Sequence, residues 1–148
     1  MEIKEFKIIF DEIAKINSFE KSFGGWFIEN DESIIVLDLQ KSNFGNHYEL
    51  NIKIFIQGLF AKFYKKSKDL VKKEIGNIFL RQPIKYNSVL DFDANMDNNL
   101  RKQLLEQLFE KFINPISNKA KTRKGIKELA FDKQILLLPA VEKALNEL

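Results

Sequence analysis

The chain has 148 residues, a formal net charge of +3, 45% hydrophobic residues and no cysteine. This length suits a single domain over residues 1–148, and the hydrophobic content excludes a disordered chain or a linker. The absence of cysteine excludes disulfide scaffolds, zinc fingers and cysteine nucleophiles. No apolar run approaches the roughly 18 residues of a membrane span, and charges interrupt the first residues, unlike a signal peptide. We therefore expect a cytoplasmic protein.

Apolar residues at helical spacing open the chain. Ile3, Phe6, Phe10 and Ile13 lie three or four positions apart, which predicts an amphipathic helix over residues 2–17. The period then changes to two, which predicts strands at about 25–29, 33–41 and 47–57. Short, turn-forming segments separate these strands, so an antiparallel meander is expected.

The second half returns to helical spacing, interrupted once. Residues 59–74 predict a lysine-rich helix, and residues 76–83 predict a strand that ends at Pro83. A helix over 98–113 follows, and a final helix over 139–148 begins at Pro139. The buried stripe predicted for the 98–113 helix is Leu100, Leu104, Leu108 and Phe112. The order of elements predicts a two-layer α+β fold, in which N-terminal and C-terminal helices cover one face of an antiparallel four- to five-stranded sheet.

Residue patterns typical of enzymes and metal sites are incomplete. His47 is the only histidine, and no serine elbow or second histidine accompanies it. Asp91, Asp93 and Asp97 match the opening of a calcium loop, but Met96 and Lys102 stand where the loop needs Gly and Glu. We therefore expect no enzymatic activity, no bound metal and no cofactor, with Asp97 capping the following helix instead.

Positive charge gathers between residues 62 and 73, beside several aromatic residues. Aromatic rings next to basic groups can hold single-stranded nucleic acid, and a basic amphipathic helix can lie on a membrane or a partner protein. The simpler interpretation is a helix with phenylalanine in the core and lysine in water. The residues that would carry the nucleic-acid alternative are Lys62, Lys65, Lys66, Lys72 and Lys73.

Three short motifs resemble a family of small bacterial α+β proteins described only as a domain of unknown function. They are Val36 to Ser42, Tyr48 with Asn51 and Ile52, and Ile78 to Arg81. The first and last helices fit the family as well, whereas the lysine-rich stretch 59–74 and the lack of a late tryptophan depart from it. Members of the family lie in mixed bacterial gene neighbourhoods, some with toxin-immunity genes, which implies a binding role.

The resemblance and the strand alternation indicate a polar patch on the sheet. Gln40 and Ser42 share one face of their strand, as do Asn51 and Lys53 of the next. Cross-strand hydrogen bonding and turn support would explain the same residues without any ligand. We expect a non-enzymatic module that binds an unknown protein partner, and an immunity-type inhibitor is one form of such a module. The residues expected to bind the partner are Gln40, Lys41, Ser42, Asn51 and Arg81.

Overall fold

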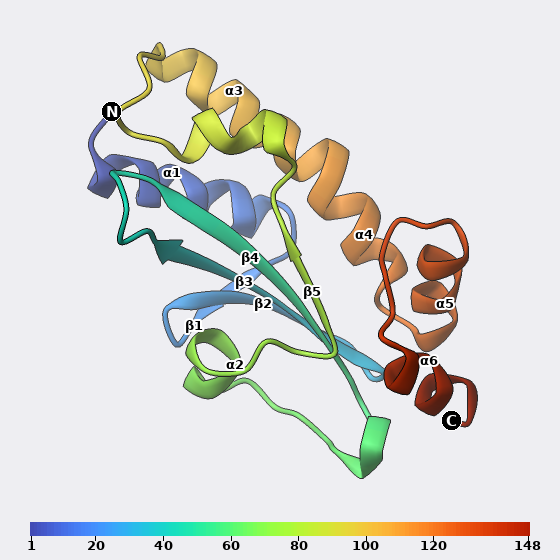
Figure 1. Cartoon of the computed structure of the whole chain (residues 1–148). Coiled ribbons are helices and arrows are strands. Elements are labelled where there is room, and N and C mark those ends of the chain that lie inside the picture. Colours follow the sequence, from blue (N-terminus) through green and yellow to red (C-terminus); the bar gives the residue numbers. More distant parts are fainter.

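A computed structural model describes all 148 residues, which form a five-stranded antiparallel sheet in the order β1-β2-β3-β4-β5 (Figure 1). The strands are β1 (Glu20–Ser22), β2 (Gly25–Glu29), β3 (Ser33–Lys41), β4 (Tyr48–Ile56) and β5 (Ile78–Arg81). The helices are α1 (Ile3–Ile16), α2 (Lys68–Lys72), α3 (Asn98–Leu108), α4 (Asn114–Lys119), α5 (Arg123–Phe131) and α6 (Pro139–Asn146). The predicted α+β class, with an antiparallel sheet flanked by N-terminal and C-terminal helices, is confirmed.

The central strands lie where the alternating pattern predicts them. β3 and β4 pair from Ser33 opposite Ile56 to Lys41 opposite Tyr48. Strand β1 was not predicted, because three residues are too short for an alternating pattern to be seen. A two-residue turn joins it to β2, and both turn residues, Phe23 and Gly24, have positive φ angles of 53° and 79°. Positive φ at both positions is typical of the tight turn that matches strand twist in a hairpin.

The main core lies between one face of the sheet and the helices α1, α3 and α4 (Figure 1). Phe10 of α1 is fully buried there, with its ring 4.6 Å from that of Trp26 and 5.4 Å from that of Phe109. Alternate residues of β3 and β4, among them Leu37 and Leu50, close this core from the sheet side. The high phenylalanine content of the chain thus serves helix-to-sheet packing.

The helix predicted over 98–113 differs from the structure in its end and in its buried face. The chain stays helical past Pro115 to Lys119, with one wider π-helical turn at Phe109–Ile113. That turn precedes the proline, whose ring would clash with a regular preceding turn. Leu100 is 45% exposed, whereas Arg101 is 2% exposed. Of the predicted stripe, Leu108 is fully buried, and Leu104 and Phe112 are partly buried against the main core. The prediction was therefore wrong at Leu100, and Arg101 is buried instead.

The helix predicted over 59–74 was wrong. Residues 57–77, which we call the strap segment, contain a 3₁₀ turn at Leu59–Ala61, an extended stretch and the short helix α2. Phe60 and Ala61 have φ angles of 53° and 59°, which no right-handed helix contains. The Gln57 side chain then accepts a hydrogen bond from the Tyr64 amide (2.6 Å) and donates one to the Tyr64 carbonyl (2.8 Å). These two bonds hold the segment in an extended conformation.

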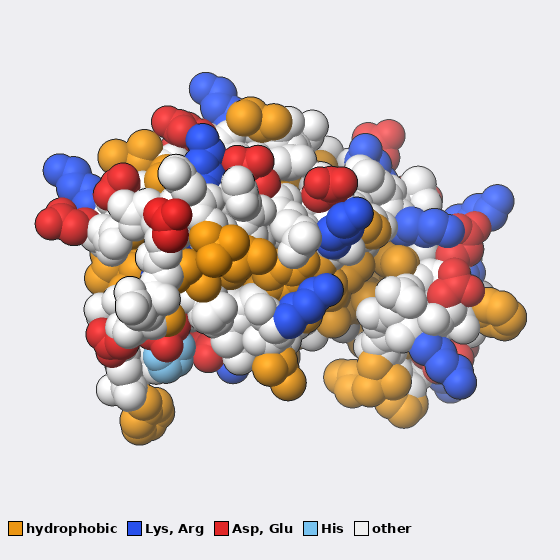
Figure 2. Space-filling view, turned by 90° about the horizontal axis from the view of Figure 1, so that it is seen from above, with side chains coloured by type: hydrophobic (Ala, Val, Ile, Leu, Met, Phe, Trp, Pro, Cys, Tyr) orange, Lys and Arg blue, Asp and Glu red, His pale blue; other side chains and the backbone are white.

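The last helices lie at one end of the molecule, where α5 and α6 gather beside the ends of the strands (Figure 1). Their buried residues Ile126, Leu129 and Leu145 belong to the main core. Exposed hydrophobic side chains also lie at this end, as Figure 2 shows, and Phe131 is 88% exposed. None of the helices combines the length and the apolar character needed to cross a membrane.

Candidate functional site

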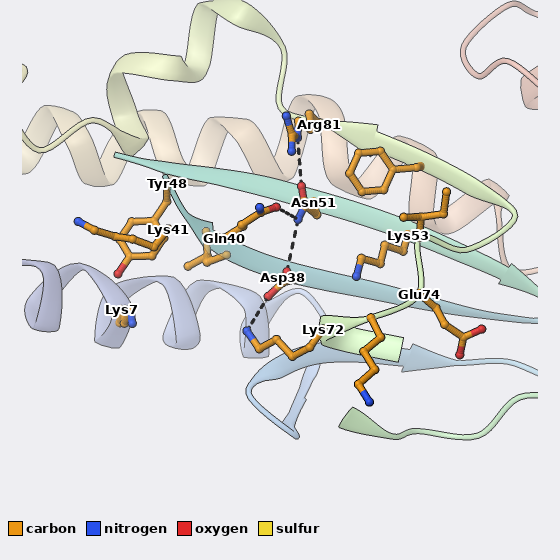
Figure 3. A pocket seen from close by; sticks show the side chains of 14 residues that line it. Lys7, Asp38, Gln40, Lys41, Tyr48, Asn51, Lys53, Lys72, Glu74 and Arg81 are labelled. Carbon is orange, nitrogen blue, oxygen red and sulfur yellow. Dashed lines mark hydrogen bonds and ion pairs between the residues drawn. The ribbon is translucent and has the colours of Figure 1, made fainter. Parts of the chain in front are cut away.

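The second face of the sheet is divided into an apolar half and a polar half. Leu70 and Val71 of α2 cover the apolar half, where they pack on Phe27, Ile34 and Phe55. The polar half is open and forms a cleft of about 560 Å³, here called the polar cleft (Figure 3). Its polar lining consists of Lys7, Asp38, Gln40, Lys41, Tyr48, Asn51, Lys53, Lys72, Lys73, Glu74 and Arg81.

A row of polar side chains crosses three strands on the floor of the cleft. Asp38 of β3 pairs with Asn51 of β4, which in turn pairs with Arg81 of β5. Directly opposed residues in an antiparallel sheet point to the same face, so the strand register brings these three side chains together. The Asn51 amide donates to Gln40 Oε1 (2.9 Å) and to Asp38 Oδ2 (3.3 Å), and its oxygen accepts from Arg81 Nε (3.2 Å) (Figure 3).

The row continues into α2 through an ion pair. Lys72 Nζ lies 3.0 Å from Asp38 Oδ1 (Figure 3). The Asp38 side chain is only 7% exposed, so this pair is partly shielded from water and acts more strongly than a pair on the open surface. The contact ties the strap segment to the sheet at the margin of the cleft.

Lys53 holds the C-terminal end of α2, close to the Lys72 ion pair. Its side chain rises from β4, and its Nζ donates to the carbonyl oxygens of Leu70 (3.2 Å) and Val71 (2.7 Å). These carbonyls end a short helix and have no partner further along it, so the ammonium group satisfies them. Burial lowers the pKa of Lys53 from its usual value of 10.5, while the negative charge of Asp38 opposes that shift. The lysine therefore acts as a structural contact below α2.

The structure brings together three of the five residues predicted to form the binding patch. Gln40, Asn51 and Arg81 meet in the cleft as described. Lys41 lies at its margin, where Nζ donates to Asn46 Oδ1 (3.2 Å). Ser42 lies outside, because its hydroxyl accepts from the Phe44 amide (3.0 Å) and supports the turn between β3 and β4. A role of these residues in binding stays a prediction.

The lysines of the nucleic-acid alternative do not form one continuous basic surface. Lys66 Nζ lies 3.1 Å from Glu20 Oε1 and 3.5 Å from Glu29 Oε1. Lys73 Nζ lies 3.7 Å from Asp69 Oδ1. Lys72 is held by Asp38, as described above. Only Lys62 and Lys65 are exposed without a carboxylate partner. The positive charge apparent in the sequence is therefore largely compensated within the fold.

The loop that resembles a calcium site is held by Arg101. One terminal nitrogen, Nη1, donates to the carbonyls of Ser88 (3.1 Å), Val89 (2.7 Å) and Asp91 (3.0 Å), and the other, Nη2, to that of Ala94 (3.3 Å). The Arg101 guanidinium thus binds the backbone of this loop and of the turn before it. Asp97 caps α3 by accepting from the Asn99 amide, as predicted. No cluster of three or more acidic or histidine side chains with metal-binding geometry is present.

His47 lies just before β4, at an isolated bridge with Asp91. Its Nε2 is 3.6 Å from Glu49 Oε1.

Several residues of the cleft are not among the five predicted binding residues. The most central of them are Asp38 and the supporting Lys53, although Lys53 was predicted to share a strand face with Asn51. Both are charged residues within the apolar runs of β3 and β4. Asp38 lies on the same face of β3 as Gln40, and Lys53 lies on the same face of β4 as Asn51. A charge within an otherwise apolar strand is the signal that could have found them.

Most of the chain matches a family model described as a domain of unknown function, DUF4304, over residues 10–119. The chain belongs to the DUF4304 family. No curated protein and no solved structure matches it. The DUF4304 match includes the whole sheet and every residue of the polar cleft except Lys7. Helices α5 and α6 lie beyond it.

Proposed function

We propose that this DUF4304 chain is a non-enzymatic module that binds an acidic protein partner in the polar cleft. The observation that carries the proposal is the charge of the lining. Six cationic side chains and only two carboxylates surround a cleft of about 560 Å³. Such a surface attracts negatively charged groups and speeds their encounter with the cleft.

The structure of the cleft floor supports a role beyond folding. Asn51 and Asp38 are 4% and 5% exposed, and both are polar groups on a sheet face whose other half is apolar. Apolar side chains at such positions are often as stabilising as buried polar ones, or more so. A retained row of polar side chains that opens into a cleft is therefore consistent with recognition of a ligand.

The test is capture of proteins from a lysate of the native host, with nuclease present and at moderate salt. We expect one protein to be retained stoichiometrically by the wild type and to be lost from Arg81→Ala. The matched control is Lys85→Ala, which removes one exposed positive charge beyond β5 and outside the cleft. Both variants should nearly keep the thermal midpoint of the wild type, as should Gln40→Ala, because Arg81 and Gln40 are exposed and water can replace their bonds to Asn51.

Further outcomes separate the proposal from its alternatives. The affinity for the partner should fall as salt is raised, because exposed charges are screened. Loss of all retained material on nuclease treatment would instead favour nucleic acid bound through Lys62 and Lys65. An immunity-type role belongs to the same proposal, and it predicts that the captured partner is a toxin whose activity falls when the complex forms.

A further inference from the structure

Arg81 differs from the other two arginines in how its guanidinium is used. Arg101 donates through both terminal nitrogens to backbone carbonyls. Arg123 donates Nη2 to the Gln57 carbonyl (2.7 Å) and lies 3.5 Å from Glu32. Arg81 uses only Nε, and its terminal nitrogens have no hydrogen-bond or ion-pair partner in the chain. Four N–H donors of Arg81 are thus available at the cleft.

The orientation of this guanidinium is held from two sides. Asn51 cannot turn its amide without losing the bonds to Gln40 and Asp38, so its oxygen stays directed at Arg81 Nε. On the other side, the Arg81 guanidinium carbon lies 5.7 Å from the centre of the Phe79 ring. A cation at that distance from an aromatic face is attracted to it. Less side-chain freedom is therefore lost when a ligand binds.

The free edge of a guanidinium offers two parallel N–H groups, which match the two oxygens of a carboxylate. We infer that Arg81, positioned by Asn51, is the anchor for a carboxylate of the partner, supplied by an aspartate or glutamate side chain. This inference rests on the proposed function and names the chemical group that the cleft recognises.

A phosphate also carries oxygens of suitable spacing, but the cleft favours a carboxylate, which carries the smaller negative charge. Asp38 and Glu74 line the same cleft, and their repulsion grows with the charge of the ligand. Three of the other cations are already engaged: Lys53 with α2, Lys72 with Asp38 and Lys73 with Asp69. A single oriented guanidinium with these neighbours suits a singly charged carboxylate better than a doubly charged phosphate.

The test is a nuclear magnetic resonance titration of the full chain, followed at the arginine Nε–H signals. The chain has three arginines, so three signals are expected. An acetylated, amidated tetraglutamate peptide at low salt should shift the Arg81 signal in a saturable way and leave the buried Arg101 signal unchanged. The uncharged tetraglutamine peptide is the control ligand and should shift neither signal.

The decisive variant is Arg81→Lys, which keeps the charge but removes the paired donors. We expect its affinity for the tetraglutamate peptide, measured from backbone amide shifts, to be about tenfold lower. An unchanged affinity would overturn the inference, because any positive charge would then suffice. Inorganic phosphate that saturates the Arg81 signal at a lower concentration than the peptide would overturn the choice of carboxylate.

Failure of this inference can be told from failure of the proposed function. A partner captured equally well by wild type and Arg81→Lys would overturn the carboxylate anchor and leave protein binding in place. Saturable peptide binding without any captured protein would overturn the proposed function and leave the carboxylate site in place.

Discussion

Asn51 organises the polar cleft because one amide side chain serves three neighbours. Its nitrogen donates to Gln40 and Asp38, and its oxygen accepts from Arg81. A buried amide with every group paired avoids the penalty of an unsatisfied polar atom and also fixes the rotamers of its partners. Asn51 is therefore a positioning residue, whereas Arg81 is the one that faces a ligand.

Lys53 should contribute to stability through the two carbonyls that it satisfies. In Lys53→Met the apolar stem remains buried, but the carbonyls of Leu70 and Val71 lose their donor. We expect the free energy of unfolding to fall by about 1–3 kcal/mol, the usual penalty for unpaired buried polar groups. Urea denaturation measures this change. A stability equal to that of the wild type would mean that methionine packing compensates for the lost bonds.

The same pair of proteins tests the protonation of Lys53. Burial lowers its folded pKa below 10.5, so the unfolded chain holds this proton more tightly than the folded chain. The resulting destabilisation is present below the folded pKa and is lost as the pH rises through that pKa toward 10.5. The wild type should therefore gain stability relative to Lys53→Met over that range. A difference that stays constant with pH would contradict the lowered pKa.

Among the secondary-structure elements, the strap segment differs most from the helix predicted for it. Its lysines and aromatics fall at spacings that a helix could use, yet the chain turns sharply at Phe60 and Ala61. Long-range contacts outweigh the local preference, because Gln57 binds the backbone of Tyr64 and Lys53 binds the end of α2. Helix propensity is a weak preference that tertiary contacts commonly override.

The turn in the strap segment carries strain that glycine should relieve. Ala61 has a φ of 59°, a conformation that costs an L-residue roughly 1–2 kcal/mol. Glycine adopts it freely but loses about 0.5–1 kcal/mol through its greater freedom in the unfolded chain. We expect Ala61→Gly to raise the free energy of unfolding by up to about 1 kcal/mol, measured by chemical denaturation.

A matched control for that substitution lies in α1. Ala14 is helical and fully buried, so Ala14→Gly should lower stability by about 1 kcal/mol or more. If Ala61→Gly lowers stability as Ala14→Gly does, the positive φ at position 61 is not strained.

The last helices of the chain complete the core of the part that precedes them. The family match ends at residue 119, but α5, α6 and the segment between them add five large buried apolar side chains to the main core. These are Ile126, Leu129, Ile135, Val141 and Leu145. A buried hydrogen bond from Ser33 Oγ to the Ala120 carbonyl (2.6 Å) joins the two parts.

A chain that ends at Lys119 should therefore not fold cooperatively. Each of the five side chains contributes about 1.5–3 kcal/mol by burial, and their sum is comparable to the 5–15 kcal/mol of net stability typical of a domain. Thermal unfolding followed by circular dichroism should show no sharp transition. A control chain that ends at Asn146 keeps all five side chains and should unfold as the full chain does. A cooperative transition in the shorter chain would contradict this account.

The sequence predicted the elements whose pattern is local and regular. Side chains of a strand alternate between its faces, so the runs at 33–41 and 47–57 identified the two central strands, which the structure has at Ser33–Lys41 and Tyr48–Ile56. Helix α1 followed from its spacing in the same way. The helix predicted over 98–113 was wrong at Leu100, because burial of the neighbouring Arg101 depends on the carbonyls of a loop that helical spacing does not describe.

The spacing of residues along the chain was enough to predict that helices cover an antiparallel sheet and that Gln40, Asn51 and Arg81 belong to polar positions of that sheet. That these three side chains meet could not be predicted, because their contact depends on the register of three strands and on the path of the strap segment between two of them. Which charges are free also depends on the tertiary structure. Ion pairs with distant carboxylates hold Lys66 and Lys72, whereas the terminal nitrogens of Arg81 have no partner, and sequence separation conceals such pairings.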